Sequence, residues 1–174
     1  LKTKLNFYKN KGKENYPVNG ENTPDYNWEE LDKKVAEEAK ERTNNNDYQI
    51  DNTYYDKYIR VKYNQLKDSS KNTKYDDSKE YEDLDLLLSI VKDLKLNIKF
   101  AILPAHGKWS DYTGIGSEKR QVAYNKLKEI AKNNNIEVMD YSSKEYEDYY
   151  MYDAMHLGWR GWIDFERDLY KLKK

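Results

Sequence analysis

The stretch Ile98–Leu103, IKFAIL, leads into Pro104–Gly114, PAHGKWSDYTG, and this junction decides the fold. A short, nearly continuous apolar run predicts a strand buried on both faces, as in a parallel sheet. The preceding segment, Ser78–Leu94, repeats apolar residues at helical spacing behind a serine that can cap a helix. We therefore expect a helix that leads into a buried strand. The inward face of this helix is predicted to hold Tyr81, Leu84, Leu87, Leu88, Val91 and Leu94.

The alternation of helix and strand continues toward the carboxyl terminus. Ser117 is expected to cap a helix that ends near Asn133, Ile136–Met139 is a second short strand, and Leu157–Leu172 is a final helix. Helices alternating with strands predict right-handed crossovers and a parallel sheet. The expected fold class is therefore α/β, with a three-layer, mostly parallel sheet flanked by helices. The inward residues of the middle helix are predicted to be Val122, Leu127, Ile130 and Ala131.

The region upstream of these elements is more polar. Leu1–Asp25 is predicted to be an irregular arm, because it is polar and rich in turn-forming residues. Asn27 can cap a helix that begins at Trp28, with Glu30 as its capping-box partner. Tyr54–Leu66 is predicted to be helical as well. Because no repeat or compositional break divides the chain, residues 1–174 are expected to belong to one domain.

Composition narrows the function classes. Lys and Arg number 31 against 32 Asp and Glu, so the chain lacks the basic excess with which proteins neutralise nucleic-acid phosphates. The absence of cysteine excludes a thiol nucleophile and zinc–thiolate sites. Mean hydropathy is -1.20, and no apolar run approaches the roughly 20 residues that span a bilayer. Since the chain begins at Leu1 and not at methionine, we expect any signal or anchor to lie upstream.

Both histidines of the chain lie in loops that leave the predicted strands. Ligands of open α/β sheets bind beyond the carboxyl ends of the strands, so the loops with His106 and His156 are expected to meet there. Asp153 stands three residues before His156, within one turn. Its carboxylate is predicted to contact a ring nitrogen, fix the tautomer and stabilise the imidazolium. The alternative for each histidine is a plain surface residue.

Two motifs carry a resemblance to a known family. The segment KWSDYTG at 108–114 and the segment DAMHLGWRGW at 153–162 are similar to sequences of the DltD family, and the resemblance runs from about Tyr16 to the end. It implies the carboxyl-terminal part of an SGNH-hydrolase-like or flavodoxin-like domain. It also implies D-alanylation of (lipo)teichoic acid at the extracellular face of the cell membrane. The reaction would be Ser-His-Asp-type acyl transfer or (thio)ester hydrolysis, with His156 as general base and Asp153 as its orienter.

The chain departs from the family pattern in two places. The Gly–Ser pair that carries the nucleophile has no counterpart, so the serine is expected upstream and the 174-residue chain alone is expected to be inactive. If that is wrong, Ser142 and Ser143 are the next candidates, because they closely follow a strand. His106 occupies a position where the family places an asparagine of the oxyanion hole, and an imidazole N–H can also donate there. By resemblance, the substrate-binding residues are His106, Gly107, Trp109, Tyr112 and Trp159.

The resemblance also implies partners, and two other functions remain as alternatives to the one it implies. Teichoic acid or a D-alanyl carrier would be the substrate, other teichoic acid D-alanylation proteins would be partners, and an upstream anchor would provide the only membrane contact. No nucleic acid, metal or organic cofactor is expected. The rival function is a non-catalytic cell-envelope module that binds teichoic acid or glycan, followed by a purely structural cell-surface domain. Trp159 and Trp162, at helical spacing, could instead be core residues. A sheet without its first strand is expected to leave an apolar strand edge exposed, or to have that edge covered by the arm Leu1–Asp25 or by self-association.

Overall fold

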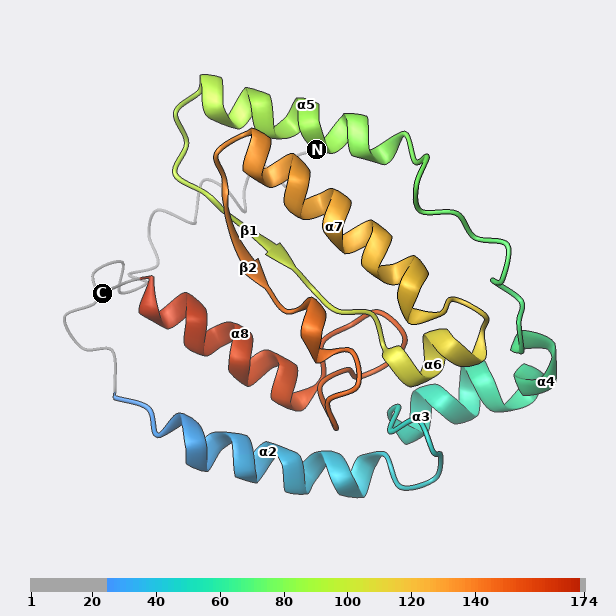
Figure 1. Cartoon of the computed structure of the whole chain (residues 1–174). Coiled ribbons are helices and arrows are strands. Elements are labelled where there is room, and N and C mark those ends of the chain that lie inside the picture. The colour runs from blue at the N-terminus through green and yellow to red at the C-terminus, as the bar shows by residue number, and fades with distance from the viewer. Residues whose placement is uncertain (1–24, 173–174) are drawn as a thin grey trace, which may run out of the picture.

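A computed structural model describes residues 25–172, so all but the last residue of the expected arm Leu1–Asp25 lies outside the described part. Two parallel strands lie between two groups of helices (Figure 1). A π-helical turn at Tyr55–Ile59 and 3-10 turns at Arg60–Lys62 and Ser142–Lys144 complete the regular structure. In chain order, the labelled elements are α2 Trp28–Arg42, α3 Asn52–Tyr54, α4 Tyr63–Leu66, α5 Glu80–Asp93, β1 Lys99–Ile102, α6 Gly107–Tyr112, α7 Ser117–Asn133, β2 Glu137–Asp140 and α8 Trp159–Lys171.

The sheet confirms the predicted α/β class in its coarse form. β1 and β2 pair in parallel, from Lys99 opposite Glu137 to Ile102 opposite Asp140, and α7 connects them. The predicted order of helix, strand, helix, strand and helix is therefore confirmed as α5, β1, α7, β2 and α8. Two strands form the sheet within residues 25–172, so the wider three-layer sheet stays a prediction.

Side chains on the two faces of the sheet pack against different helices. Phe100 and Val138 pack against the cluster that contains Leu88 of α5 and Ile130 of α7. Met139, one residue further along β2, packs on the opposite side with Phe165 of α8. Alternate residues of a strand point to opposite faces, which explains the division. α2 covers α8 from outside, so the helices lie on both sides of the strands (Figure 1).

The local signals at the helix ends are partly confirmed. Asn27 caps α2 by accepting from the Glu30 backbone N–H at 3.2 Å, and the Glu30 carboxylate accepts from the Asn27 amide. The prediction that Ser117 caps α7 is wrong, because Ser117 is the first helical residue and Gly116 stands at the cap without a side-chain bond. The segment 54–66 is helical as predicted, although it changes from α to π to 3-10 geometry along its length.

The loop predicted at Pro104–Gly114 contains a helix, α6, which the sequence prediction missed. Six residues are too few to show an apolar period, and the start of the helix depends on a side chain that is not a usual cap. His106 occupies the cap position, and its ring accepts from the Trp109 backbone N–H. The segment after β1 is therefore partly helical where a loop was expected.

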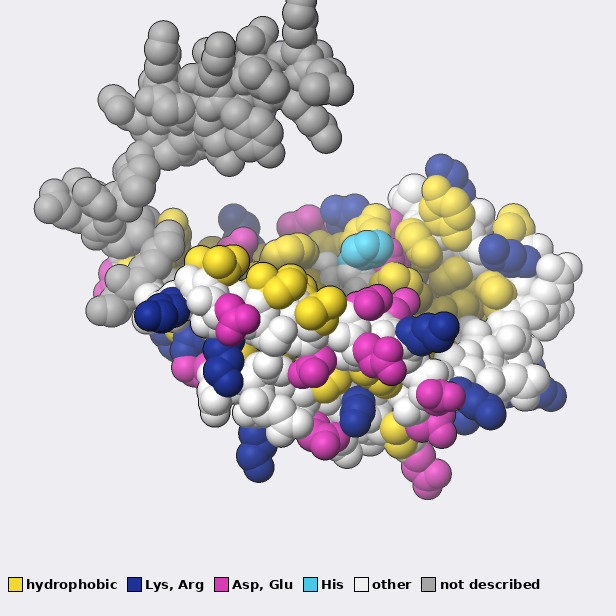
Figure 2. Space-filling view, turned by 90° about the horizontal axis from the view of Figure 1, so that it is seen from above, with side chains coloured by type: hydrophobic (Ala, Val, Ile, Leu, Met, Phe, Trp, Pro, Cys, Tyr) yellow, Lys and Arg dark blue, Asp and Glu magenta, His cyan; other side chains and the backbone are white. Residues whose placement is uncertain are grey.

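An apolar face is exposed along α5 and the start of α7. Leu87 and Leu94 were predicted to face inward, but they are 56% and 64% exposed, and Val122 is 46% exposed. β1 itself is mostly half-buried, which corrects the prediction of burial on both faces. Figure 2 shows a band of hydrophobic side chains on the upper side of the molecule, with a histidine beside it. These exposed residues lie on helices, so the expected apolar strand edge stays a prediction. Leu86 and Ile90 belong to the same exposed set.

Removing the hydroxyl group from each of two buried tyrosines is expected to change the free energy of unfolding in opposite directions. Within residues 25–172 the Tyr150 hydroxyl is buried without a hydrogen-bond partner, so Tyr150→Phe is expected to raise the free energy of unfolding by up to about 1 kcal/mol. The Tyr124 hydroxyl donates to Glu145 at 2.8 Å and accepts from the Ala105 N–H at 2.7 Å. Tyr124→Phe is therefore expected to lower the free energy of unfolding by about 1–3 kcal/mol. Urea denaturation measures both changes, and a loss of stability in Tyr150→Phe would contradict the first.

Candidate active site

The Asp153–His156 pair sits in a tight turn between β2 and α8. The Tyr152 N–H donates to the His156 carbonyl at 2.9 Å, and Met151 and Leu157 form an antiparallel bridge that closes the base of the turn. One Asp153 carboxylate oxygen accepts from the backbone N–H groups of Met155 and His156 at 2.8 and 2.9 Å. The other lies 2.8 Å from the His156 Nδ1, which confirms the predicted contact.

The environment of this pair suits proton transfer. Burial alone would raise the pKa of Asp153, but the N–H groups of Met155 and His156 and the His156 ring together hold it below its usual range. An ionised carboxylate can only accept, so the proton of neutral His156 belongs on Nδ1. The Nε2 lone pair then faces away, and no described residue hydrogen-bonds it. The His156 side chain is 75% exposed while that of Asp153 is 5% exposed. His156 is therefore a solvent-exposed base that contacts the buried, charged carboxylate of Asp153.

The loops that follow β1 and β2 meet at one end of the sheet, as predicted. Ala154 packs into the cluster that contains Trp109 of α6. On its other side, Ala154 and Met155 line a cavity of about 250 Å³ with Leu103 and Pro104. Because both strands are parallel, their carboxyl ends lie at the same edge, and this edge carries the Asp153–His156 turn.

His106 is not a plain surface residue. Its side chain is buried, its Nδ1 accepts from the Trp109 N–H, and its Nε2 lies 2.7 Å from the Tyr48 carbonyl oxygen. A carbonyl can only accept, so Nε2 carries the proton and the ring is neutral. Burial lowers the pKa of His106, which favours the same neutral form. The N–H expected to serve an oxyanion is thus given to Tyr48, and the substrate-binding role of His106 stays a prediction.

Gly107 and Trp109 join the two loops in different ways. A side chain at Gly107 would meet the Tyr146 ring at 2.7 Å and the Glu145 carbonyl oxygen at 2.8 Å. The Gly107 N–H donates to that same carbonyl at 2.7 Å, so glycine permits the close approach. Trp109 is mostly buried against Ile50, yet it also lines a cavity of about 370 Å³. The other residues around this cavity are Tyr54, Tyr58, Ile59, Lys62, Leu66 and Ala154.

Tyr112, Trp159 and Trp162 have different surroundings. Tyr112 stacks on Tyr63 with centroids 4.4 Å apart and donates its hydroxyl to the Tyr63 carbonyl at 3.0 Å. Trp159, at the start of α8, contacts Tyr152 with centroids 5.6 Å apart. Trp162 is 50% exposed, so the interpretation of Trp162 as a core residue is wrong. Trp159 therefore borders the Asp153–His156 turn through Tyr152, whereas Tyr112 packs on Trp109 in the cluster around Ile50. The ligand contacts of both residues stay predictions.

A buried ion pair that sequence reasoning missed holds these loops together. Arg120 of α7 is 3% exposed and binds both Glu145 carboxylate oxygens, at 2.6 and 3.1 Å. The same guanidinium donates to Asp111 of α6 at 2.8 Å and to the Tyr146 hydroxyl at 2.7 Å. A sequence signal existed, because Arg120 precedes Tyr124 by one helical turn on the buried stripe of α7.

Other reactive groups near the site have structural partners. The Ser142 Oγ accepts from the Lys128 Nζ at 3.2 Å, and the Ser142 N–H donates to Asp140, which gives this serine a role in the turn after β2.

Within residues 25–172, no three His, Asp or Glu side chains converge in a way that could hold a metal ion. The helices in this range are also too short or too polar to cross a membrane.

Fold and site together define a class: α/β proteins that carry an Asp–His pair at the carboxyl edge of a parallel sheet, with the imidazole open to solvent. A family model described as "DltD protein" matches residues 1–174, so the chain belongs to the DltD family. This confirms the resemblance drawn from the two motifs.

Curated relatives bear the same family name. The chain is 35% identical over 153 residues to "Protein DltD" of Bacillus subtilis and 30% identical over 151 residues to that of Staphylococcus aureus. These matches cover 86% and 87% of this chain but 39% and 38% of the relatives. A third match, at 30% identity over 143 residues, is to "Protein DltD" of Lacticaseibacillus rhamnosus. The chain thus spans under two fifths of the length of the relatives it matches.

Proposed function

We propose that this chain supplies the histidine and aspartate of a Ser-His-Asp-type site that serves D-alanylation of teichoic acid. The observation that carries the proposal is the Asp153–His156 pair, with its carboxylate buried and its Nε2 open. The serine would come from residues upstream of this chain in a longer DltD protein, as part of a wider SGNH-like sheet. Such a protein would work at the extracellular face of the cell membrane, on teichoic acid or a D-alanyl carrier and with other D-alanylation proteins.

In the proposed reaction, His156 transfers one proton in each half of acyl transfer. Its Nε2 accepts the hydroxyl proton while the serine oxygen attacks the D-alanyl carbonyl, and it returns this proton to the leaving alcohol or thiol. Asp153 keeps the proton of Nδ1 in place and stabilises the imidazolium that forms between the two steps. The second half repeats this sequence with water or the acceptor hydroxyl as the attacking group.

A second candidate is a non-catalytic module that binds teichoic acid or glycan. The observation that favours it is the cavity of about 370 Å³ beside Ala154, which has aromatic walls and a lysine at its margin. Tyrosine and tryptophan present flat apolar faces with polar tips, which suits sugar and polyol ligands. In this case the Asp153–His156 pair would serve only to shape the turn.

The two candidates are separated by turnover of an activated D-alanyl ester. We expect a longer DltD chain that includes this sequence to hydrolyse the ester, and the 174-residue chain alone to show no turnover above buffer. The physical reason is that a general base without a nucleophile can do no more than activate water. Turnover by the 174-residue chain that His156→Ala removes would place the nucleophile in this chain, with Ser142 and Ser143 as the first candidates. Binding of teichoic acid without turnover by either chain would favour the binding module.

A further inference from the structure

A distant part of the backbone is hydrogen-bonded to the Asp153–His156 turn. Among the described residues, one backbone hydrogen bond reaches residues 149–158 from outside the segment that follows β2: the Asp51 N–H donates to the Tyr152 carbonyl at 3.0 Å. Tyr152 directly precedes Asp153, and its own N–H closes the turn onto the His156 carbonyl. The peptide groups on both sides of Tyr152 are thus held, and the Asp153 side chain leaves the backbone immediately after them.

Asp51 is itself held rigidly. The residue is 1% exposed, and one carboxylate oxygen accepts from the N–H groups of Thr53 and Tyr54 at 3.0 and 3.2 Å, which caps α3. The other oxygen accepts from the Arg42 Nη2 at 3.0 Å, at the end of α2. A buried carboxylate with three donors has one strongly preferred position. A fixed Asp51 side chain also fixes the backbone of this residue. Its N–H group is thereby held where it donates to the Tyr152 carbonyl oxygen.

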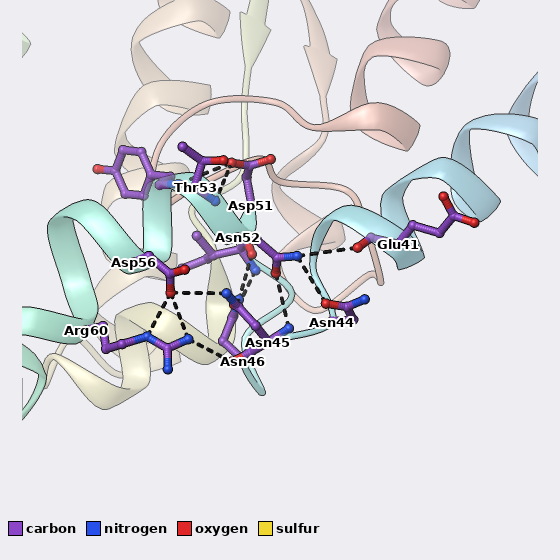
Figure 3. A network of polar contacts seen from close by, with 11 residues as sticks. Glu41, Asn44, Asn45, Asn46, Asp51, Asn52, Thr53, Asp56 and Arg60 are labelled. Atoms are coloured by element: carbon purple, nitrogen blue, oxygen red, sulfur yellow. Dashed lines mark hydrogen bonds and ion pairs between the residues drawn. The ribbon is translucent and has the colours of Figure 1, made fainter.

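An asparagine-rich turn fixes the residues on both sides of Asp51. The Asn46 side chain accepts from the Ile50 N–H at 3.1 Å and donates to the Ile50 carbonyl at 2.7 Å. The Asn52 side chain accepts from the Asn45 N–H at 3.1 Å and donates to the Asn44 side chain at 3.1 Å. Figure 3 shows these side chains converging between the end of α2 and the start of α3. The backbone of residues 50–52 is therefore set by side chains that lie away from His156.

Aromatic packing connects the same elements to the turn. The rings of Tyr54 of α3 and Tyr152 meet with centroids 6.4 Å apart, and Tyr152 packs on Trp159 at 5.6 Å. The Arg42 guanidinium lies over the Trp159 ring, 5.5 Å from its centroid. Arg42, at the end of α2, thus contacts both Asp51 and Trp159. Each of these two residues in turn contacts Tyr152.

From this geometry we infer that Asp51, held by the asparagine-rich turn, is a positioning residue for the Asp153–His156 pair. It touches neither the imidazole nor any reacting atom, and it acts through the Tyr152 peptide. The inference rests on the proposed function for its catalytic meaning. Its structural content is independent: the proton of His156 stays on Nδ1 because Asp51 keeps the Asp153 carboxylate in line with that nitrogen.

The test is the tautomer of His156, which ring ¹⁵N chemical shifts report in the neutral form. The chain contains two histidines, and His156→Ala assigns their signals. We expect wild type to show His156 with its proton mainly on Nδ1. Asp51→Ala is expected to make the Nε2–H form the majority, as in an unconstrained imidazole. Asp51→Asn is expected to restore much of the wild-type pattern, because its amide oxygen can still accept from the Thr53 and Tyr54 N–H groups.

Controls separate positioning from general loss of structure. Asp56→Ala removes another acid of the same network, one that contacts Asn45 and Arg60 but not Tyr152, and it is expected to leave the His156 tautomer unchanged. His106 reports folding in every variant through its contact with Tyr48. If Asp51→Ala does not fold, Asn46→Ala decides the question, because it loosens Ile50 and leaves Asp51 intact. A wild-type His156 tautomer in the folded variant would overturn the inference.

The tautomer measurement also keeps this inference apart from the proposed function. It requires no substrate and no nucleophile, so it can succeed even if no DltD chain turns over a D-alanyl ester. In a longer chain that does turn over, Asp51→Ala is expected to lower kcat with KM unchanged, because the base is misaligned while the ligand surface remains.

Discussion

Replacing Arg120 with methionine is expected to lower the free energy of unfolding by about 3–5 kcal/mol, because it leaves a buried carboxylate without its cation. Glu145 is 5% exposed and receives two of its three side-chain hydrogen bonds from Arg120. The guanidinium also binds the Ile115 carbonyl and the side chains of Asp111 and Tyr146. These bonds pull α6 and the loop after β2 onto α7, so their loss loosens the whole edge of the sheet that carries His156.

Urea denaturation of three variants would measure this effect. The double variant Arg120→Met, Glu145→Leu removes both charges and is expected to recover at least half of the loss, since an apolar pair needs no counter-charge. Lys33→Met, which breaks the exposed pair with Glu29 on α2, is expected to change stability by less than about 0.5 kcal/mol. If Arg120→Met lost less than about 1 kcal/mol, water or a rearranged neighbour would be satisfying Glu145, and the assignment of Arg120 as the central link would fail.

Asp153→Asn in a longer DltD chain is expected to reduce kcat by about 10⁴, with little loss of folding stability. The asparagine oxygen can take over the bonds from the Met155 and His156 N–H groups, at 2.8 and 2.9 Å. Its amide nitrogen then replaces the oxygen that lies 2.8 Å from the His156 Nδ1. An amide N–H can only donate, so Nδ1 becomes the acceptor and the proton moves to Nε2. Nε2 of His156 then carries a proton and can no longer act as the base, while the shape of the turn is kept.

Turnover of an activated D-alanyl ester, compared with His156→Ala and the double variant, measures this prediction. The three losses are expected to be similar and not additive, because the two residues act as one unit. The assays belong above about pH 5, where wild-type Asp153 is fully charged, because its pKa lies below the usual value. Activity of Asp153→Asn within tenfold of wild type would show that the carboxylate has no part in the chemistry and would favour the binding module.

Sequence reasoning located the Asp–His pair but misjudged its surroundings. The pair could be found because three residues of one turn separate its members, and local spacing brought them together. The exposure of Leu87, Leu94 and Val122 could not be found, because helical spacing shows that a face is apolar and not whether another element covers it. His106 could not be interpreted either, since its partner, the Tyr48 carbonyl, lies 58 residues away in the chain.

The sequence by itself determined the order of helices and strands, the family through its two motifs, and the contact between Asp153 and His156. The order of elements depends on periodicity and the Asp153–His156 contact on spacing within one turn, and backbone geometry sets both. The family follows from the resemblance of the two motifs. The tertiary structure alone decided that Arg120 pairs with Glu145, that His106 bonds the Tyr48 carbonyl, and that Asp51 reaches Tyr152. These contacts join segments far apart in the chain. Burial makes each of them specific, because a charged or polar group removed from water must find its partner within the fold.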